Sequence, residues 1–366
     1  MTVSEEQVTA GALAEPPAGP RRSILTRRGG PNDLLRSALP LVVVIIALSL
    51  FTNSHNASFL TGDNIDNILV QSAVLGILVV GQTFLIIGGE VDLSVGSMVS
   101  FTSVLGAWMY THGWSPVVVA VMLLVVGTGV GLLWGLLVAH VGVPSFILTV
   151  GGLGFFSSLA LILSQNRPIS VASVLGDLGF ATWLGLPALA VIFLAVCVVG
   201  AVVLHSTRFG RQVFAVGSSE QTAFLAGLPT KRITVTLFVV NGLLVGLAGI
   251  VQLARLSAGD PTSGAGLELS CIAAVVLGGA ALTGGRGSMI GGLLGTLLFG
   301  VISASLVFLN IGGSWKDFVT GAVLIFAVTM AAASYKRGRR STDTARTRRR
   351  LLSPATGNST TRTPRR

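Results

Sequence analysis

Long apolar runs separated by short polar stretches dominate the chain. On the scale of a membrane-spanning helix, about 20 apolar residues, the pattern predicts ten segments. They lie near 38–54, 67–88, 94–111, 116–140, 144–165, 183–204, 233–254, 269–283, 288–309 and 317–334. The eighth segment is short and rich in glycine, so it is predicted to be a partial or re-entrant element shielded by its neighbours. The pattern therefore predicts an all-α polytopic membrane protein with about ten transmembrane helices.

The two ends of the chain differ from this pattern. Residues 1–36 are rich in Pro, Gly, Ala and Arg without apolar periodicity, and 336–366 form a basic tail. Both are predicted to be disordered, which leaves a transmembrane domain over 37–335. The apolar run 39–52 follows a long hydrophilic stretch and precedes no small-residue cleavage site. We therefore interpret it as the first membrane span and not as a secretory signal.

Basic residues indicate the orientation of the chain. With the N-terminus inside, ten segments place 21 of the 24 Lys and Arg residues on the inner side. That distribution follows the positive-inside rule, so both termini are predicted to be cytoplasmic. The net charge of +10 then needs no nucleic-acid partner, because no basic surface with interleaved aromatic residues occurs. Attraction to anionic membrane lipid follows as a side effect.

The loop 205–232 is the longest polar interruption in the middle of the chain. Its basic residues are Arg208, Arg211, Lys231 and Arg232. Within the loop, Ser218 to Gly227 is predicted to form a short helix, with Ser218 as its cap and Gln221 reaching back as in a capping box. Gly227 and Pro229 would end it. The simple interpretation is a structured loop, and the alternative is a helix presented to a soluble partner.

A glycine-rich turn with two acidic residues joins the second and third segments. Its candidate turn or gate residues are Gly88, Gly89, Asp92, Ser94 and Gly96. The glycines would make the turn, and Asp92 or Ser94 would cap the next helix. The alternative is a gate or contact role for Glu90 and Asp92, because acids at a membrane boundary are costly unless they are solvated or paired.

The 47 glycines predict closely packed helices. Runs occur at 127–131, 151–154 and 284–287. Small residues let helix backbones approach one another in a membrane, where the hydrophobic effect does not drive association.

Polar residues inside the predicted spans are almost all neutral. They include Gln71, Gln82, Asn241 and Gln252. Each is most simply an interhelical hydrogen-bonding residue, and the alternative is a pathway for an uncharged, hydroxyl-rich solute. The lack of acids and bases in the middle of the spans argues against a proton or sodium relay. No P-loop and no metal-binding or catalytic spacing occurs, so we expect no enzyme activity, metal or cofactor in this chain.

Four stretches resemble the membrane permease subunits of bacterial ribose/xylose/galactose-type ABC importers. They are GGEVDLSVGSM at 88–98, VPSFILTVGG at 143–152, TRFGRQVFAVGSSEQTAFLAGL at 207–228 and LELSCIAAVVLGGAALTGGRGSMIGGLLGTLLFGVI at 267–302. The resemblance implies the pathway for a small neutral sugar (a pentose, hexose or related polyol) across the bacterial cytoplasmic membrane. The chain departs from the family at Ser219–Ala223, where members often show an Asn-Glu-Ala-Ala pattern, and at Glu90-Val91.

The resemblance also implies partners. Members of the family pair as dimers of like or unlike permeases and dock onto cytoplasmic ATPase subunits, which bind the ATP. An extracytoplasmic sugar-binding protein delivers the substrate. The positions that match the ATPase-coupling loop are Arg208, Gly210, Arg211, Gly217, Ser219, Glu220, Ala223 and Gly227.

Two other transport functions stay open. A branched-chain amino-acid ABC permease would share the glycine-rich later half and the need for an ATPase. An ion-coupled secondary sugar carrier would need no ATP, and the neutral spans argue against it. A non-transporting scaffold has no use for so many glycine-packed spans.

Overall fold

The computed structural model describes residues 31–171 and 174–312, together with scattered residues between 315 and 329. Most of the two predicted tails, and half of the tenth predicted segment, therefore lie outside the described residues. The described chain is mainly helical, with four very short strands.

The helices follow one another with short connections. In chain order they are α1 (Pro31–His55), α2 (Gly62–Gly88), α3 (Val95–Thr111), α4 (Pro116–Leu136) continued by the π-turn η1 (Leu137–Val141), α5 (Ser145–Ser164), α6 (Val174–Phe180), α7 (Ala188–Ser206), α8 (Arg208–Ser218), α9 (Glu220–Leu225), α10 (Thr230–Leu256), α11 (Leu267–Leu277) and α12 (Met289–Phe308). The strands are β1 (Ile169–Ser170), β2 (Thr182–Trp183), β3 (Leu186–Pro187) and β4 (Ala258–Gly259). β1 pairs antiparallel with β4, and β2 with β3.

Seven helices in the described part are long and apolar enough to cross a membrane. They are α1 from Ala38, α2, α4 with η1, α5, α7, α10 and α12. With 17 and 11 residues, α3 and α11 are shorter than a full span. Nine of the ten predicted segments coincide with a helix in the described part, and the count of ten spans stays a prediction. The polytopic all-α class is confirmed.

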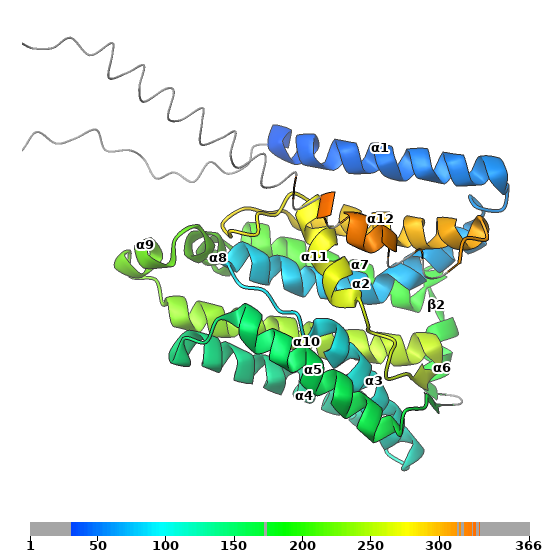
Figure 1. The fold of residues 1–366 in the computed structure, drawn as a ribbon, viewed down its shortest axis with the longest axis horizontal. Coiled ribbons are helices and arrows are strands. Elements are labelled where there is room, and N and C mark those ends of the chain that lie inside the picture. The colour runs from blue at the N-terminus through cyan, green and yellow to red at the C-terminus, as the bar shows by residue number, and fades with distance from the viewer. Residues whose placement is uncertain are drawn as a thin grey trace, which may run out of the picture.

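The bundle is organised around α2 and α10. The long helices run side by side, with α1 and α12 on one flank and α4 and α5 on the other (Figure 1). α10 packs against α4, α2 and α3, while α12 packs against α2, α1 and α11. Every residue of α2 from Ser72 to Gly88 is buried. By contrast, α5 exposes large apolar side chains such as Ile162, which is 72% exposed, as expected for a helix facing lipid or a partner.

Two crossings of the bundle are broken, and their helical halves meet inside it. α11 has 11 residues and so spans about 16 Å, roughly half of a hydrocarbon core of about 30 Å. The non-helical stretch 257–266 comes just before α11 in the chain. It lies alongside α3, with Gly259 against Ala107 and Gly264 against Gly96. Because Gly96 also faces Glu268 in the first turn of α11, the starts of α3 and α11 lie together. The predicted re-entrant character of 269–283 takes this form.

The interface of α4 and α10 depends on glycine. A Cβ atom at Gly127 would collide with the carbonyl oxygen of Gly242, and one at Gly131 with that of Phe238. The predicted close packing therefore holds for these residues. It does not extend to every glycine of the run, because a Cβ at Gly129 would meet no atom within 4 Å.

Replacing Gly127 with Ala is expected to destabilise the fold by about 1–3 kcal/mol, because two backbones would have to separate. The thermal unfolding midpoint in detergent measures this effect. Gly129→Ala, in the same helix, is the matched control and should stay within about 1 kcal/mol of the wild type. Equal midpoints for the two variants would contradict the packing argument.

Candidate functional site

The helices α8 and α9 form a polar surface at one end of the bundle, to the left in Figure 1. Thr207 caps α8, its Oγ1 accepting a hydrogen bond from the Gly210 backbone N–H at 3.2 Å. Gly210, Val213 and Val216 are buried, one turn apart along the helix, whereas Arg208 is exposed. The helix is therefore amphipathic and lies with its apolar face on the bundle.

The predicted short helix exists as α9, but its cap is displaced by one residue. Ser219, and not Ser218, caps it, since the Oγ of Ser219 accepts from the Thr222 N–H at 3.2 Å. Ser218 instead ends α8, and its hydroxyl donates to the carbonyl of Phe214. A capping box with Gln221 is therefore wrong.

α9 exposes two large apolar side chains beside the exposed polar residues Glu220, Gln221 and Thr222. Phe224 and Leu225 are 67% and 79% exposed, while Ala223 is buried against the bundle. Gly227 ends the turn after α9 in the left-handed region, with φ at 82°, as predicted from its position. The α9 surface thus combines a buried anchor with two large side chains that no other part of the described chain covers.

Two glycine turns from distant parts of the chain meet at Gly217 of α8. Gly217 lies against the carbonyl oxygen of Ile87 at the end of α2. The same carbonyl accepts a hydrogen bond from the Gly285 N–H at 2.8 Å. Gly89, with φ at 91°, faces the Cα of Gly217. The predicted coupling loop and the predicted turn at Gly88-Gly89 therefore touch, and a side chain at Gly217 would force them apart.

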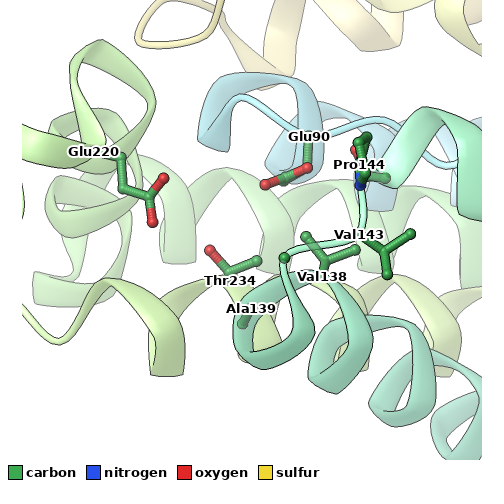
Figure 2. A pocket seen from close by; sticks show the side chains of 9 residues that line it. Glu90, Val138, Ala139, Val143, Pro144, Glu220 and Thr234 are labelled. Atoms are coloured by element: carbon green, nitrogen blue, oxygen red, sulfur yellow. The ribbon is translucent and has the colours of Figure 1, made fainter.

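A cavity of about 310 Å³ opens beside this junction. Glu90, Glu220 and Thr234 face it from the segment after α2, from α9 and from α10 (Figure 2), and Ser145 from the start of α5 also lines it. Burial raises the pKa of the Glu90 carboxyl above its usual range; a hydrogen bond with Ser145 opposes the shift, and the charge of Glu220 adds to it. Two acids thus share one cavity.

Beyond Glu90, the non-helical segment Gly89–Ser94 runs into the core. Its N–H groups at Val91 and Leu93 donate to the hydroxyls of Ser145 and Thr149, at 3.4 and 3.1 Å. Both hydroxyls belong to α5 and are one turn apart. They satisfy backbone groups that no helix satisfies, which is the requirement for irregular backbone at membrane depth.

Asp92 is the centre of a buried hydrogen-bond network. It is 2% exposed, and its Oδ1 accepts from the N–H and hydroxyl of Ser94 at 2.8 and 2.6 Å. Its Oδ2 accepts from Asn241 Nδ2 at 2.9 Å, and Trp134 Nε1 donates to Ser94 Oγ at 3.2 Å. Ser94 is the residue before α3, but its side chain makes no cap bond. Asp92 stabilises this turn by accepting the hydrogen bond of the Ser94 N–H.

The four predicted pathway amides do not form one surface. Asn241 bonds Asp92, and Gln252 Nε2 donates to the Ser263 carbonyl at 3.5 Å. Gln82 is fully buried with no hydrogen-bond partner for either amide atom, and Gln71 is exposed. The three buried amides are at most 1% exposed, so they line no open passage in this conformation.

Several residues of this network escape sequence reasoning. Thr149 and Trp134 lie in apolar runs, and only the i, i+4 spacing of Ser145 and Thr149 indicates a shared polar face. Asp92 and Glu268 were placed near segment ends by the sequence, and both do lie outside the middle of a helix. The fold nevertheless buries Asp92 and brings Glu268 against Gly96.

Among the described residues, no group of three or more His, Cys, Asp and Glu side chains lies close enough to hold a metal ion. The two cysteines, Cys197 and Cys271, are buried and unpaired.

Glycine-packed spans, broken crossings and an amphipathic helix pair at one end define a multi-pass membrane protein. The family described as branched-chain amino acid transport system / permease component matches residues 64–328, more than two thirds of the sequence. The chain belongs to this permease family.

Individual relatives cover nearly the whole chain. Ribose import permease protein RbsC of Bacillus subtilis (strain 168) is 35% identical over 306 residues, which are 82% of this chain and 93% of that protein. L-arabinose ABC transporter permease protein AraH of Azospirillum brasilense is 35% identical over 315 residues, 86% of this chain and 92% of that protein. Probable ABC transporter permease protein YphD of Escherichia coli (strain K12) is 38% identical over 295 residues, 79% and 87% of the two chains. The resemblance carried by the four motifs is confirmed. No solved structure matches the chain.

Glu90→Gln is expected to raise the thermal unfolding midpoint at neutral pH. Because the pKa of Glu90 is raised in the folded protein, its ionised form destabilises the fold at high pH, and this cost disappears as pH falls toward the ordinary carboxyl range near 4.5. The difference between variant and wild type should therefore shrink on acidification. Thermal melts in detergent across this range measure it.

Asp177→Asn provides the control, since it changes an exposed carboxyl of α6 at the opposite end of the bundle. A midpoint for Glu90→Gln at or below that of the wild type at neutral pH would contradict the account of the cavity.

Proposed function

We propose that this chain is the membrane-spanning subunit of an ATP-driven importer and forms the pathway for a small neutral sugar across the bacterial cytoplasmic membrane. The observation that carries the proposal is the match along more than nine tenths of two permeases whose names specify ribose and L-arabinose. The family description names branched-chain amino acids, but these individual relatives favour a sugar over an amino acid. The chain itself is a transport subunit, and a separate ATPase would hydrolyse the ATP.

The end of the bundle that carries α8 and α9 is proposed to face the cytoplasm. The loop 205–232 brings four basic residues to this end, and Arg286 lies in the glycine turn beneath it. Basic loops are retained on the inner side of a bacterial membrane. The opposite end, with α6 and the β2–β3 hairpin, would then receive the extracytoplasmic sugar-binding protein.

The α9 surface is the proposed contact for the ATPase. Phe224 and Leu225 are exposed apolar side chains at the cytoplasmic end, where neither lipid nor the rest of the described chain covers them. Ala223 anchors α9, and α8 rests on the ends of α2 and the Gly284-Gly285 turn. A displacement of α9 would therefore be transmitted through α8 to α2. A second permease copy, identical or not, completes the proposed transporter.

The pathway residues have a conformational requirement. Gln82, Asn241 and Gln252 are enclosed within one chain, so they can meet substrate only in a state that opens the contact between α2 and α10. Alternating access demands two such states, and a ligand drives the change only through different affinities for them.

Phe224→Asp is expected to weaken ATPase binding by about tenfold or more, because a charge would replace an exposed apolar anchor at the interface. A tagged pull-down from mild detergent, with co-purifying proteins identified by mass, measures the loss of a P-loop ATPase. Membrane insertion should be unchanged, since the Phe224 side chain is 67% exposed.

Phe180→Asp is the matched control, because Phe180 is 85% exposed at the opposite end. It should keep the ATPase. Equal recovery of the ATPase with both variants would show that α9 is not the contact.

ATP-loaded proteoliposomes that contain the complete transporter are expected to accumulate labelled ribose or arabinose and not labelled leucine. Competition among unlabelled sugars and amino acids defines the substrate class. Preferential leucine uptake would replace the sugar with the amino-acid alternative, and sugar uptake in ATP-free vesicles that collapses with the ion gradient would support a secondary carrier.

A further inference from the structure

The segment Gly89–Ser94 connects the α8–α9 end of the bundle to its core. It has six residues and can span at most about 20 Å. At its outer end, Gly89 touches Gly217, and Glu90 shares the cavity with Glu220 (Figure 2). At its inner end, Ser94 precedes α3, whose first turn packs on the start of α11. The segment therefore contacts both the coupling helices and the broken crossings.

Its attachments differ along its length. The backbone N–H groups of Val91 and Leu93 donate to Ser145 and Thr149 of α5. The side chains of the alternate residues, Asp92 and Ser94, accept hydrogen bonds from Asn241 of α10 and Trp134 of α4. The Asp92–Asn241 hydrogen bond joins residues that are 149 positions apart in the chain. Among the described residues, this bond links the segment to α10.

The Asp92 carboxylate is suited to holding this connection. Its two oxygens accept three hydrogen bonds, from the Ser94 N–H, the Ser94 hydroxyl and the Asn241 amide. No ion pair with it is found in the part of the chain that the structure describes. A carboxylate accepts stronger hydrogen bonds than a neutral amide oxygen does, so an amide at this position would hold α10 less firmly.

The position of Asn241 determines what such a connection can move. Asn241 lies where α10 crosses α2 at Gly81 and is followed by Gly242, which contacts Gly127 of α4. A displacement of Asn241 is therefore a displacement of the point where α2, α4 and α10 are in closest contact. Close-packed helices at such a point shift as units and do not deform continuously.

We propose that Gly89–Ser94 transmits the movement of α8 and α9 to α10, and that Asp92 is the positioning residue that joins the segment to α10 through Asn241. The proposal rests on the proposed ATP-driven import. A displacement at Gly217 moves Gly89, the short segment cannot absorb it, and Asp92 carries it to Asn241. Without this bond, α9 still moves and ATP is still hydrolysed. The contact between α2 and α10, however, no longer changes when α9 moves.

The test uses the complete transporter in proteoliposomes with Asp92→Asn, Asn241→Asp and the double exchange of both residues. Each single variant should lower labelled ribose or arabinose uptake per ATP hydrolysed by about tenfold or more, the size expected for one hydrogen bond to a charged group. Each single variant pairs two like groups, whereas the exchange restores an amide–carboxylate pair. The double variant should therefore recover uptake per ATP to within about threefold of the wild type, a non-additive result that only directly coupled residues give.

Thr296→Val is the control, since Thr296 is fully buried and its hydroxyl bonds only the Gly292 carbonyl of its own helix. It should leave uptake per ATP unchanged. Wild-type uptake per ATP in both single variants would overturn the proposal, and so would a double variant no better than the single ones.

Hydrogen exchange of the same complexes, with and without ATP and vanadate, tests the proposal without any sugar. In the wild type, trapping should change exchange over 89–94 and over 238–245. In Asp92→Asn, the change near 89 should persist and the change over 238–245 should disappear. If the exchange change over 238–245 persisted in Asp92→Asn, the proposed link between Asp92 and α10 would be overturned. Wild-type complexes that show these exchange changes but import no sugar would overturn the proposed substrate and not the connection.

Discussion

Irregular backbone inside an apolar medium must have its N–H and carbonyl groups satisfied by the protein itself. Two non-helical stretches, 89–94 and 257–266, impose this requirement on the chain. In the first stretch, α5 supplies partners for the N–H groups of Val91 and Leu93, and Asp92 supplies one for Ser94. Side chains from α4 and α10 in turn bond the side chains of Ser94 and Asp92. Ser100 and Gln252 supply partners for the second, at Gly264 and Ser263. The packing of the surrounding helices is arranged so that these side chains reach the core.

Glycine makes that arrangement possible. Backbone contact at Gly127, Gly242 and Gly246 brings α4 and α10 closer than any side chain would allow. The same device operates at Gly217 and Gly285, where α8 meets the end of α2. Both contacts are made by backbone atoms, which cannot change rotamer. The same rigidity makes the contacts intolerant of larger residues.

Local sequence signals predicted the helices better than the residues at which they begin and end. The lengths of α2 and α10 follow from apolar runs of spanning length. The cap of α9 was predicted one residue early, because Ser218 and Ser219 are both good caps and only the extent of α8 selects between them. The run 278–283 reads as helix by composition, yet α11 ends at Leu277 because Gly278 packs against Gly291. Asp92 was predicted at a boundary and lies in the core.

The sequence by itself determined the class of protein, the helical segments, the position of the basic loop and the permease family, because hydrophobic length, charge bias and motif order are local properties of the chain. The tertiary structure decided which residues meet. The bond between Asp92 and Asn241 depends on how α2, α4 and α10 cross, and no local pattern records a partner 149 positions away. Likewise, the shared cavity of Glu90 and Glu220 exists only because the fold brings α9, which packs on α8, beside the segment after α2.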